Sequence, residues 1–266
     1  VGTGGDVNYS TRTFAAWNWK AGTTSGITTD GSTTITPSAY SFNQTAGISI
    51  IQYAGNSTSG AKLAHGLGVQ PNYVMIKRLT SAGANWQVPS TSLEPNFDWV
   101  LKLDTADAYA DNSGFFADTA PDAVNITLGD DSGTNTGHDY IAYVFASKKG
   151  FSKVGGYYGS GNTNGPFVYT GFRPAFLMIK QTAGANDWVL YDSARMPING
   201  DGVLLKPNTT AVEATNSTWT TLDLLSNGFK PRGTDGVSNG TDLQYLYIAF
   251  AEFPIVSSNS KAGTAR

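Results

Sequence analysis

The sequence predicts an all-β protein, built as two tandem antiparallel β-sandwich repeats of about 100 residues each and jelly-roll-like in character. Three observations lead to this fold class. Blocks of sequence occur twice in the same order. The composition suits short strands joined by tight turns. The apolar runs are short, and stretches rich in Gly and Asn separate them.

The clearest duplication involves two strand-like blocks. Residues 71–77 read PNYVMIK and residues 174–180 read PAFLMIK, and each is followed by a turn of small residues and a tryptophan. Further along, DYIAYVFA at residues 139–146 matches QYLYIAFA at residues 244–251. The constant order and spacing of the copies indicate a duplicated unit. Because both kinds of block are apolar at consecutive positions, we expect them to form central strands buried on both faces.

The repeated blocks divide the chain into five segments. We expect the last strand of an incomplete preceding repeat, a polar connector, the first repeat, the second repeat and a C-terminal tail. Their predicted bounds are 1–22, 23–46, 47–147, 148–254 and 255–266 respectively.

The N-terminal region contains part of a third copy. Residues 14–19 (FAAWNW) align with residues 140–145 (YIAYVF), and the first residue is valine, not methionine. We therefore expect residues 13–19 to be a strand of a preceding repeat, in a chain that is part of something longer. A lone strand would expose apolar surface and an open edge. We predict that it pairs with a sheet of this chain or of a neighbouring subunit, with Trp17 and Trp19 as assembly residues.

Within the second repeat, short strands should alternate with turns that offer Gly or Asn for positive φ. The expected strands cover residues 169–172, 175–181, 188–191, 203–206, 222–225 and 243–250.

The composition supports strands over helices and excludes several kinds of partner. Charged residues make up 14 % of the chain, below the usual quarter, and the acidic residues are nearly all Asp, which favours turns. The net charge is −3 without a basic run, so we expect no nucleic-acid partner. No apolar run approaches the ~20 residues of a membrane span, so we expect no membrane partner. The chain has no cysteine, which excludes disulfides and thiolate metal sites.

The sequence contains no recognisable catalytic constellation. It has only two histidines, His65 and His138, which lie at unlike places in the repeat and are interpreted as structural. No nucleophile elbow, zinc-protease helix, phosphate loop or dinucleotide fingerprint is present. We expect no catalytic residue and no cofactor. Facing carboxylates for glycoside hydrolysis remain conceivable among Asp98, Asp104, Asp187 and Asp192.

Two loops are rich in oxygen ligands. They are residues 129–139 (GDDSGTNTGHD) and residues 199–202 (NGDG). Calcium loops use such side chains at defined spacings, but the first loop lacks the D-x-D-x-D-G order. Asp also caps backbone N–H groups in ordinary turns. Turn chemistry is the favoured interpretation, and we expect no metal site.

A few side chains are candidates for binding. Tyr157, Tyr158 and Trp219 lie beside Gly or in a Thr/Ser-rich stretch, where an exposed ring would stack on a sugar or fill a subunit interface. Asp192 and Arg195, in the sequence YDSAR, are interpreted as a structural ion pair. The first repeat has PSTSL at the corresponding place.

The repeated unit resembles a repeat found in structural proteins of tailed bacteriophages, notably marine and cyanobacterial phages. The matching stretches are HGLGVQPNYVMIKR (65–78), GFSKVGGYYGSGNTNGPFVYTGFRPAFLMIK (150–180), DWVLYDSAR (187–195), LLSNGFKPR (224–232) and YLYIAFAEFP (245–254). The opening WNWKAG resembles the strand that ends a repeat in that family.

The resemblance implies a non-enzymatic virion structural protein. Its location would be the virion, as a module of a tail fibre or similar appendage that acts in assembly and host attachment. Its partners would be further copies of itself, with a trimer as one arrangement, and other virion proteins. One alternative is a carbohydrate-binding adhesin that recognises a host-surface glycan, since tandem modules multiply weak affinities. A distant alternative is a glycan hydrolase.

Overall fold

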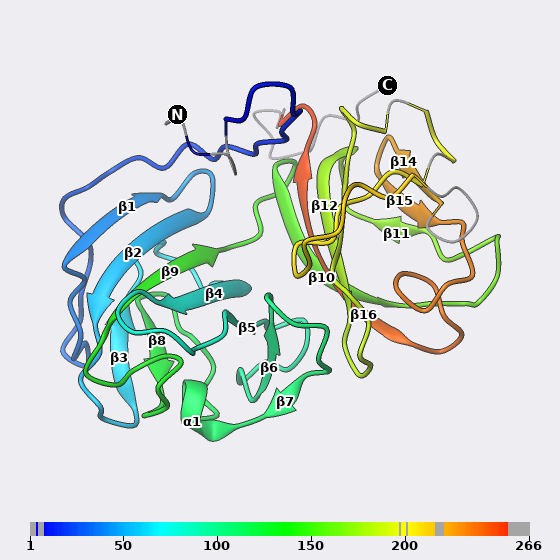
Figure 1. Cartoon of the computed structure of the whole chain (residues 1–266). Coiled ribbons are helices and arrows are strands. Elements are labelled where there is room, and N and C mark those ends of the chain that lie inside the picture. Colours follow the sequence, from blue (N-terminus) through cyan, green and yellow to red (C-terminus); the bar gives the residue numbers. More distant parts are fainter. Residues whose placement is uncertain (1–3, 5–7, 197, 201, 216–220, 255–266) are drawn as a thin grey trace.

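The computed structural model describes residues 4, 8–196, 198–200, 202–215 and 221–254. The fold is all-β, with four antiparallel sheets (Figure 1). In the described part of the chain, the one helix is the single turn α1 (Ser113–Phe116). No helix among these residues is long and apolar enough to cross a membrane.

The first half of the molecule contains a seven-stranded sheet and a separate strand pair. The order in the large sheet is β1-β2-β9-β4-β5-β6-β7, and β3 pairs with β8. The bounds are β1 (Ala39–Asn43), β2 (Ile48–Ala54), β3 (Ala61–Ala64), β4 (Tyr73–Arg78), β5 (Gln87–Pro89), β6 (Trp99–Lys102), β7 (Ala110–Asp111), β8 (Asn125–Leu128) and β9 (Asp139–Phe145).

The second half contains a four-stranded and a three-stranded sheet. Their strand orders are β10-β16-β12-β13 and β11-β15-β14. The bounds are β10 (Ser152–Tyr158), β11 (Val168–Tyr169), β12 (Pro174–Gln181), β13 (Val189–Asp192), β14 (Leu222–Leu225), β15 (Gly228–Pro231) and β16 (Gln244–Ala251).

The two halves share one strand order. The run β2-β9-β4-β5 in the first half corresponds to β10-β16-β12-β13 in the second. The register agrees as well, because Tyr53 lies opposite Tyr140 on β9 just as Tyr157 lies opposite Tyr245 on β16. The duplication in the sequence therefore corresponds to a duplicated strand arrangement.

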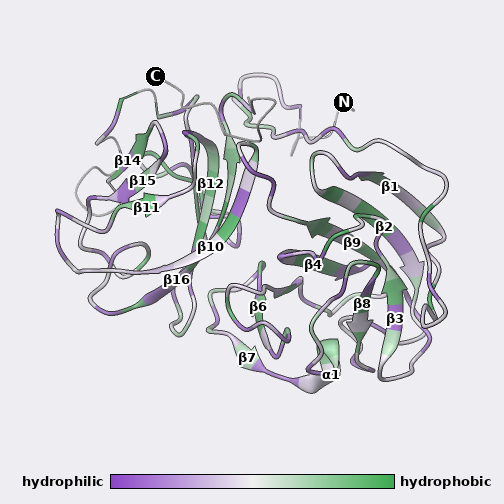
Figure 2. Cartoon of the chain, turned by 180° about the vertical axis from the view of Figure 1, so that it is seen from behind, coloured by the Kyte–Doolittle hydropathy of each residue, from purple (hydrophilic) through white to green (hydrophobic). Residues whose placement is uncertain are grey.

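Three apolar cores separate four layers of strands. The first core lies between the β3–β8 pair and the seven-stranded sheet, and the second between the four-stranded and three-stranded sheets. The third core joins the two large sheets and draws side chains from both halves. We call it the seam. Figure 2 shows hydrophobic colouring on β9 and β12, whereas many connecting loops are pale or purple.

The strands β9 and β16 occupy the central positions predicted for them. Successive residues of a strand point to opposite faces. β16 is buried on both faces, with Leu246, Ile248 and Phe250 in the seam and Tyr245, Tyr247 and Ala249 in the second core. β9 differs, because Ile141 and Tyr143 are only half-buried. Burial on both faces is therefore confirmed for β16 but not for β9. β12 is also buried on both faces, with Phe176 and Met178 in the seam and Leu177 and Ile179 in the second core.

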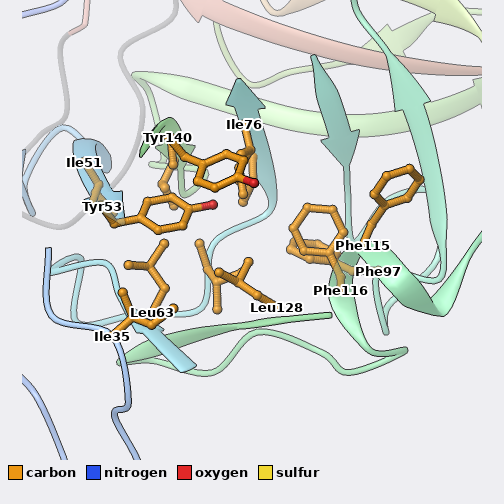
Figure 3. Close-up of a cluster of buried hydrophobic side chains, with 14 of the residues drawn as sticks. Ile35, Ile51, Tyr53, Leu63, Ile76, Phe97, Phe115, Phe116, Leu128 and Tyr140 are labelled. Carbon is orange, nitrogen blue, oxygen red and sulfur yellow. The ribbon is translucent and has the colours of Figure 1, made fainter. Parts of the chain in front are cut away.

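The core of the first half is built around a pair of stacked tyrosines (Figure 3). The rings of Tyr53 and Tyr140 lie 5.2 Å apart at 17°. The corresponding pair in the second half, Tyr157 and Tyr245, lies 4.9 Å apart at 17°. In Figure 3, Phe115 and Phe116 of α1 close the same core beside Phe97. The repeated pairs place the same aromatic packing in each half.

Hydrogen bonds also join the halves across the seam. The indole Nε1 of Trp188 donates to the carbonyl of Lys102 at 2.8 Å. The backbone N–H of Tyr109 donates to the carbonyl of Thr182 at 2.8 Å. These bonds and the shared core make the two halves one packed body.

The N-terminal region corrects two predictions. Residues 13–19 form no strand, so the predicted pairing with a sheet of this chain is wrong, whereas pairing with a neighbouring subunit stays a prediction. They pack through tryptophan side chains instead. The predicted connector, 23–46, contains a strand, because β1 pairs with β2 from Ala39↔Gln52 to Asn43↔Ile48. The isolated bridge Thr23↔Phe42 adds one further contact to β1.

The strands of the second half agree in part with the sequence. β12, β13, β14 and β16 lie close to their predicted ranges. The expected strand at 203–206 is reduced to isolated bridges at Leu204 and Leu205. The strands β10 and β15 were not predicted.

Candidate functional site

The candidate site is a groove that lies beside the N-terminal segment and belongs to the second half. Its volume is ≈1050 Å³. Residues 11–17 form one wall and residues 192–195 and 211–213 the other, and Ala175 and Leu205 also line the groove. Figure 1 shows the N-terminal segment in dark blue, crossing the molecule above the two halves.

Arg195 is the central charged group of the groove. Its Nε lies 2.5 Å from Oδ2 of Asp192, and its Nη1 lies 2.5 Å from Oε2 of Glu213. The backbone N–H of Arg195 also donates to Oδ1 of Asp192 at 2.9 Å. Asp192 is buried at the end of β13, whereas the side chain of Glu213 is 41 % exposed. The predicted ion pair is thus present, and Glu213 extends it into a three-member network.

Trp17 connects this network to the seam. The guanidinium carbon of Arg195 lies 5.9 Å from the centre of the Trp17 ring, within cation–π range. The same ring meets Phe176 edge to face, with centroids 5.7 Å apart. The N-terminal segment is therefore held beside the groove by aromatic and cationic contacts.

Trp19 closes the end of the seam. Its ring makes edge-to-face contacts with Phe250 at 5.2 Å, Phe176 at 5.5 Å and Phe145 at 6.3 Å. Phe145 ends β9 and Phe250 lies near the end of β16, so one side chain touches both halves. The two predicted assembly residues therefore both pack against the seam of this chain, where Trp19 forms a clamp, and their role in assembly stays a prediction.

The first half has no equivalent groove residues. The segment corresponding to Asp192–Arg195 contains Ser90, whose hydroxyl donates to the carbonyl of Asn72 at 2.8 Å. Leu93 of the same segment is buried in the seam. The groove is therefore a property of the second half and of the N-terminal segment that crosses it.

The residues predicted to stack on a sugar do not form a site together. Tyr157 is buried, and its hydroxyl donates to the carbonyl of Ser238 at 2.7 Å, so the expectation of an exposed ring is wrong. Tyr158 is 64 % exposed, because adjacent residues of β10 point to opposite faces. Trp219 lies outside the described residues. Neither tyrosine lines the groove.

Sequence reasoning missed several groove residues, among them Arg12, Phe14 and Glu213. Phe14 was visible only as part of the expected strand. Glu213 is one of three glutamates in the chain, and this rarity was the one available signal.

The oxygen-rich loop at 129–139 is explained by turn chemistry. Oδ1 of Asp131 accepts from the backbone N–H of Gly133 at 2.6 Å. Asp235 repeats this in the second half, where it accepts from Val237 at 2.7 Å. The described residues hold no group of three or more His, Cys, Asp or Glu side chains that could bind a metal ion. Asp201, in the smaller loop, lies outside the described residues.

A buried asparagine ties each of these loops together. Nδ2 of Asn135 donates to the carbonyls of Gly129 at 2.8 Å and Thr58 at 2.9 Å. Nδ2 of Asn239 donates to the carbonyls of Gly233 at 2.7 Å and Asn162 at 2.8 Å. Burial makes these bonds important, since a buried carbonyl without a donor is costly.

The histidines are placed as structural residues. His65 is fully buried, with Nδ1 accepting from the backbone N–H of Leu67 at 3.2 Å and Nε2 lying 3.2 Å from the carbonyl of Asp122. These contacts suit a neutral ring with its proton on Nε2. Burial lowers the pKa of His65 to about 4. His138 lies 3.3 Å from the Thr80 hydroxyl.

Three of the four carboxylates considered for hydrolysis pair with cations. Asp104 pairs with Lys77 at 3.4 Å, Asp187 pairs with Lys206 at 2.8 Å, and Asp192 pairs with Arg195. Burial raises the pKa of Asp98, with nearby acidic groups adding to the effect. Each of the three paired carboxylates therefore contacts a cation, and Arg195 is shared between Asp192 and Glu213.

Lys180 is a buried amine with a structural explanation. Its Nζ donates to the carbonyls of Gln181 at 2.7 Å and Gly184 at 3.0 Å. Burial lowers its pKa to about 8. The equivalent Lys77 likewise donates to the carbonyl of Ala84 at 2.7 Å. Both lysines thus fix the small-residue turn that precedes a tryptophan.

The chain belongs to the family described as a domain of unknown function, DUF7483, which matches residues 1–254. No curated protein and no solved structure matches the chain.

Proposed function

We propose that this member of the DUF7483 family is a non-enzymatic structural module of a tailed-bacteriophage virion. It belongs to a tail fibre or a similar appendage, where it acts in assembly and host attachment. The observation that carries the proposal is the seam, because a shared apolar core joins successive repeats into one rigid body. The sequence resemblance to phage virion repeats supports the same function.

We infer that each half is a jelly-roll-like sandwich and that the chain is a tandem array of them. The repeated order of β2-β9-β4-β5 and β10-β16-β12-β13 supports this inference. An appendage made of such units gains length by repetition, and each unit needs only the packing of its neighbour. Further copies of the chain, as a trimer or another homo-oligomer, and other virion proteins are the partners of this module.

A non-enzymatic role is supported by how the polar side chains are used. The buried polar residues described above hold turns together through backbone contacts. The paired carboxylates are occupied by Lys or Arg, whereas a glycosidase needs two carboxyl groups that face one bond. These observations favour a scaffold over a catalyst.

The test is immunogold electron microscopy of purified virions of a phage that encodes this chain, with an antibody raised against residues 8–254. We expect gold particles at one kind of appendage, and peptides of the chain in the mass spectrum of the same particles. Absence from the particles would sink the proposal.

The non-enzymatic part has its own test. The purified chain, incubated with host polysaccharide with and without calcium, should release no sugar fragments. Sustained release that disappears in Asp192→Asn or Glu213→Gln would identify an enzyme instead.

A further inference from the structure

We propose that the groove beside the N-terminal segment binds a neutral carbohydrate. The groove combines a carboxylate–guanidinium network, aromatic side chains and a backbone segment that lies outside the sheets. Its volume of ≈1050 Å³ is similar to that of the larger ligand sites in proteins, which span ~300–1,000 Å³. This binding activity is separate from the structural role and does not depend on where the chain is located.

The charges of the lining favour an uncharged ligand. Two arginines (Arg12 and Arg195) and two carboxylates (Asp192 and Glu213) line the groove, so its formal charge is balanced. Arg195 already holds both carboxylates, which leaves little attraction for a phosphate, sulfate or carboxylate ligand. A charged ligand would also lose hydration free energy on entering the groove, whereas a neutral ligand brings no charge that must be desolvated.

The polar groups suit hydroxyl-rich ligands. A sugar hydroxyl is both donor and acceptor, so it can bond to a carboxylate and a guanidinium at once. Glu213 is partly exposed while its Oε2 is fixed by Arg195, which orients the carboxylate before any ligand arrives. The hydroxyls of Thr11, Thr13 and Ser193 also line the groove.

The backbone of the N-terminal wall adds further hydrogen-bonding groups. Among the described residues, the N–H groups of 13–19 donate to no backbone carbonyl, and the segment is in no sheet. Peptide N–H and C=O groups away from regular structure are available to a ligand. The wall therefore offers donors and acceptors along its length.

Apolar side chains provide the faces on which sugar rings stack. Phe14 is 48 % exposed and Val212 is 88 % exposed, and both line the groove. Trp17 is half-buried between them and the seam. The C–H face of a pyranose packs on such surfaces, whereas its hydroxyls point to the polar groups at the edge. The combination distinguishes this groove from the solvated turns elsewhere in the chain.

The test uses an array of neutral hexose oligosaccharides, with sialylated and sulfated glycans and extended peptides as competitors, followed by calorimetry on the best neutral ligand. We expect wild-type chain to bind neutral oligosaccharides. Phe14→Ala and Glu213→Gln should each weaken binding by about tenfold or more. Both side chains are substantially exposed, so the melting temperature should stay unchanged.

Tyr158→Ala is the matched control, because it removes an exposed ring outside the groove. It should leave the affinity unchanged. The proposal is overturned if no neutral oligosaccharide binds, if anionic glycans or peptides bind in preference, or if binding survives both groove substitutions. Loss of binding in the Tyr158 variant would place the site on β10 instead.

Discussion

Replacing Trp19 with alanine should destabilise the whole chain, because this side chain touches both halves at the seam. The ring contacts Phe145, Phe176 and Phe250, all in edge-to-face geometry. Each aromatic pair contributes about 0.5–1.5 kcal/mol beyond the area it buries. Full removal of a buried Trp costs about 3–5 kcal/mol. Since Trp19 is half-buried, we expect a loss of about 2–4 kcal/mol.

The assay is urea unfolding followed by far-ultraviolet circular dichroism, with a thermal melt in parallel. At about 2–4 °C per kcal/mol for a chain of this size, the melting temperature should fall by about 4–16 °C. Phe14→Ala is the control, because it truncates an aromatic ring of the same segment that is 48 % exposed. It should change stability by less than about 0.5 kcal/mol. An unchanged unfolding midpoint for the Trp19 variant would refute the clamp.

Three further predictions concern the cores and a buried histidine. Ala142→Leu or Ala249→Leu should overpack a fully buried position and cost about 1–3 kcal/mol in urea unfolding; a midpoint equal to wild type would contradict the central placement of β9 or β16. Asn135→Ala and Asn239→Ala should each cost about 2–4 kcal/mol, because two loop carbonyls lose a donor; a loss in only one variant would contradict equivalent roles. Burial lowers the pKa of His65 from 6.5 to about 4, so the unfolded chain binds the proton more tightly. Stability of about 3 kcal/mol, fully present above pH 6.5, should be lost as the pH falls towards 4. Subtracting the pH profile of His65→Gln from that of wild type should isolate this slope, and a flat difference would disprove it.

The strands that could be predicted are those whose residues are apolar at consecutive positions. β12 and β16 carry the repeated LMIK and YIAF blocks, and burial on both faces requires that pattern. The sequence does not predict β10, because Gly155 and Gly156 interrupt its apolar pattern. Gly155 is needed there, since a Cβ would lie 2.6 Å from the Tyr247 hydroxyl oxygen. β15 begins with Gly and ends with Pro, so it resembled a turn.

The site was less predictable because its residues come from three distant segments. The Asp192–Arg195 pair is local and was visible in the sequence. Nothing in the spacing indicates that Glu213 completes the pair or that Trp17 lies over the guanidinium. Tyr157 was misplaced for a different reason. The glycine before Tyr157 suggested an exposed ring, whereas its equivalence to the core residue Tyr53 indicates the buried position that it occupies.

The two halves differ at the sheet edge formed by β2 in the first half and by β10 in the second, because only β2 is covered by a further strand. In the first half, β1 covers the outer edge of β2. The strand equivalent to β2 in the second half is β10, which lies at the edge of its sheet. There the backbone N–H of Ser152 donates to the carbonyl of Lys148, and the backbone N–H of Val154 donates to the hydroxyl of Ser147. β1 belongs to the segment that precedes the first repeat. The second repeat begins directly after β9, and the short turn between β9 and β10 contains no additional strand that could cover the edge of β10.

The open edge of β10 is protected by its own sequence. Lys153 and two glycines occupy the strand, and Lys153 donates to the carbonyl of Tyr169 at 2.7 Å. Charged residues and weak strand formers are the usual means by which exposed edges avoid pairing with other chains. The two glycines that interrupt the apolar pattern of β10 therefore have two structural roles. Gly155 makes room for the Tyr247 ring, and both glycines weaken an edge that the duplicated unit does not cover.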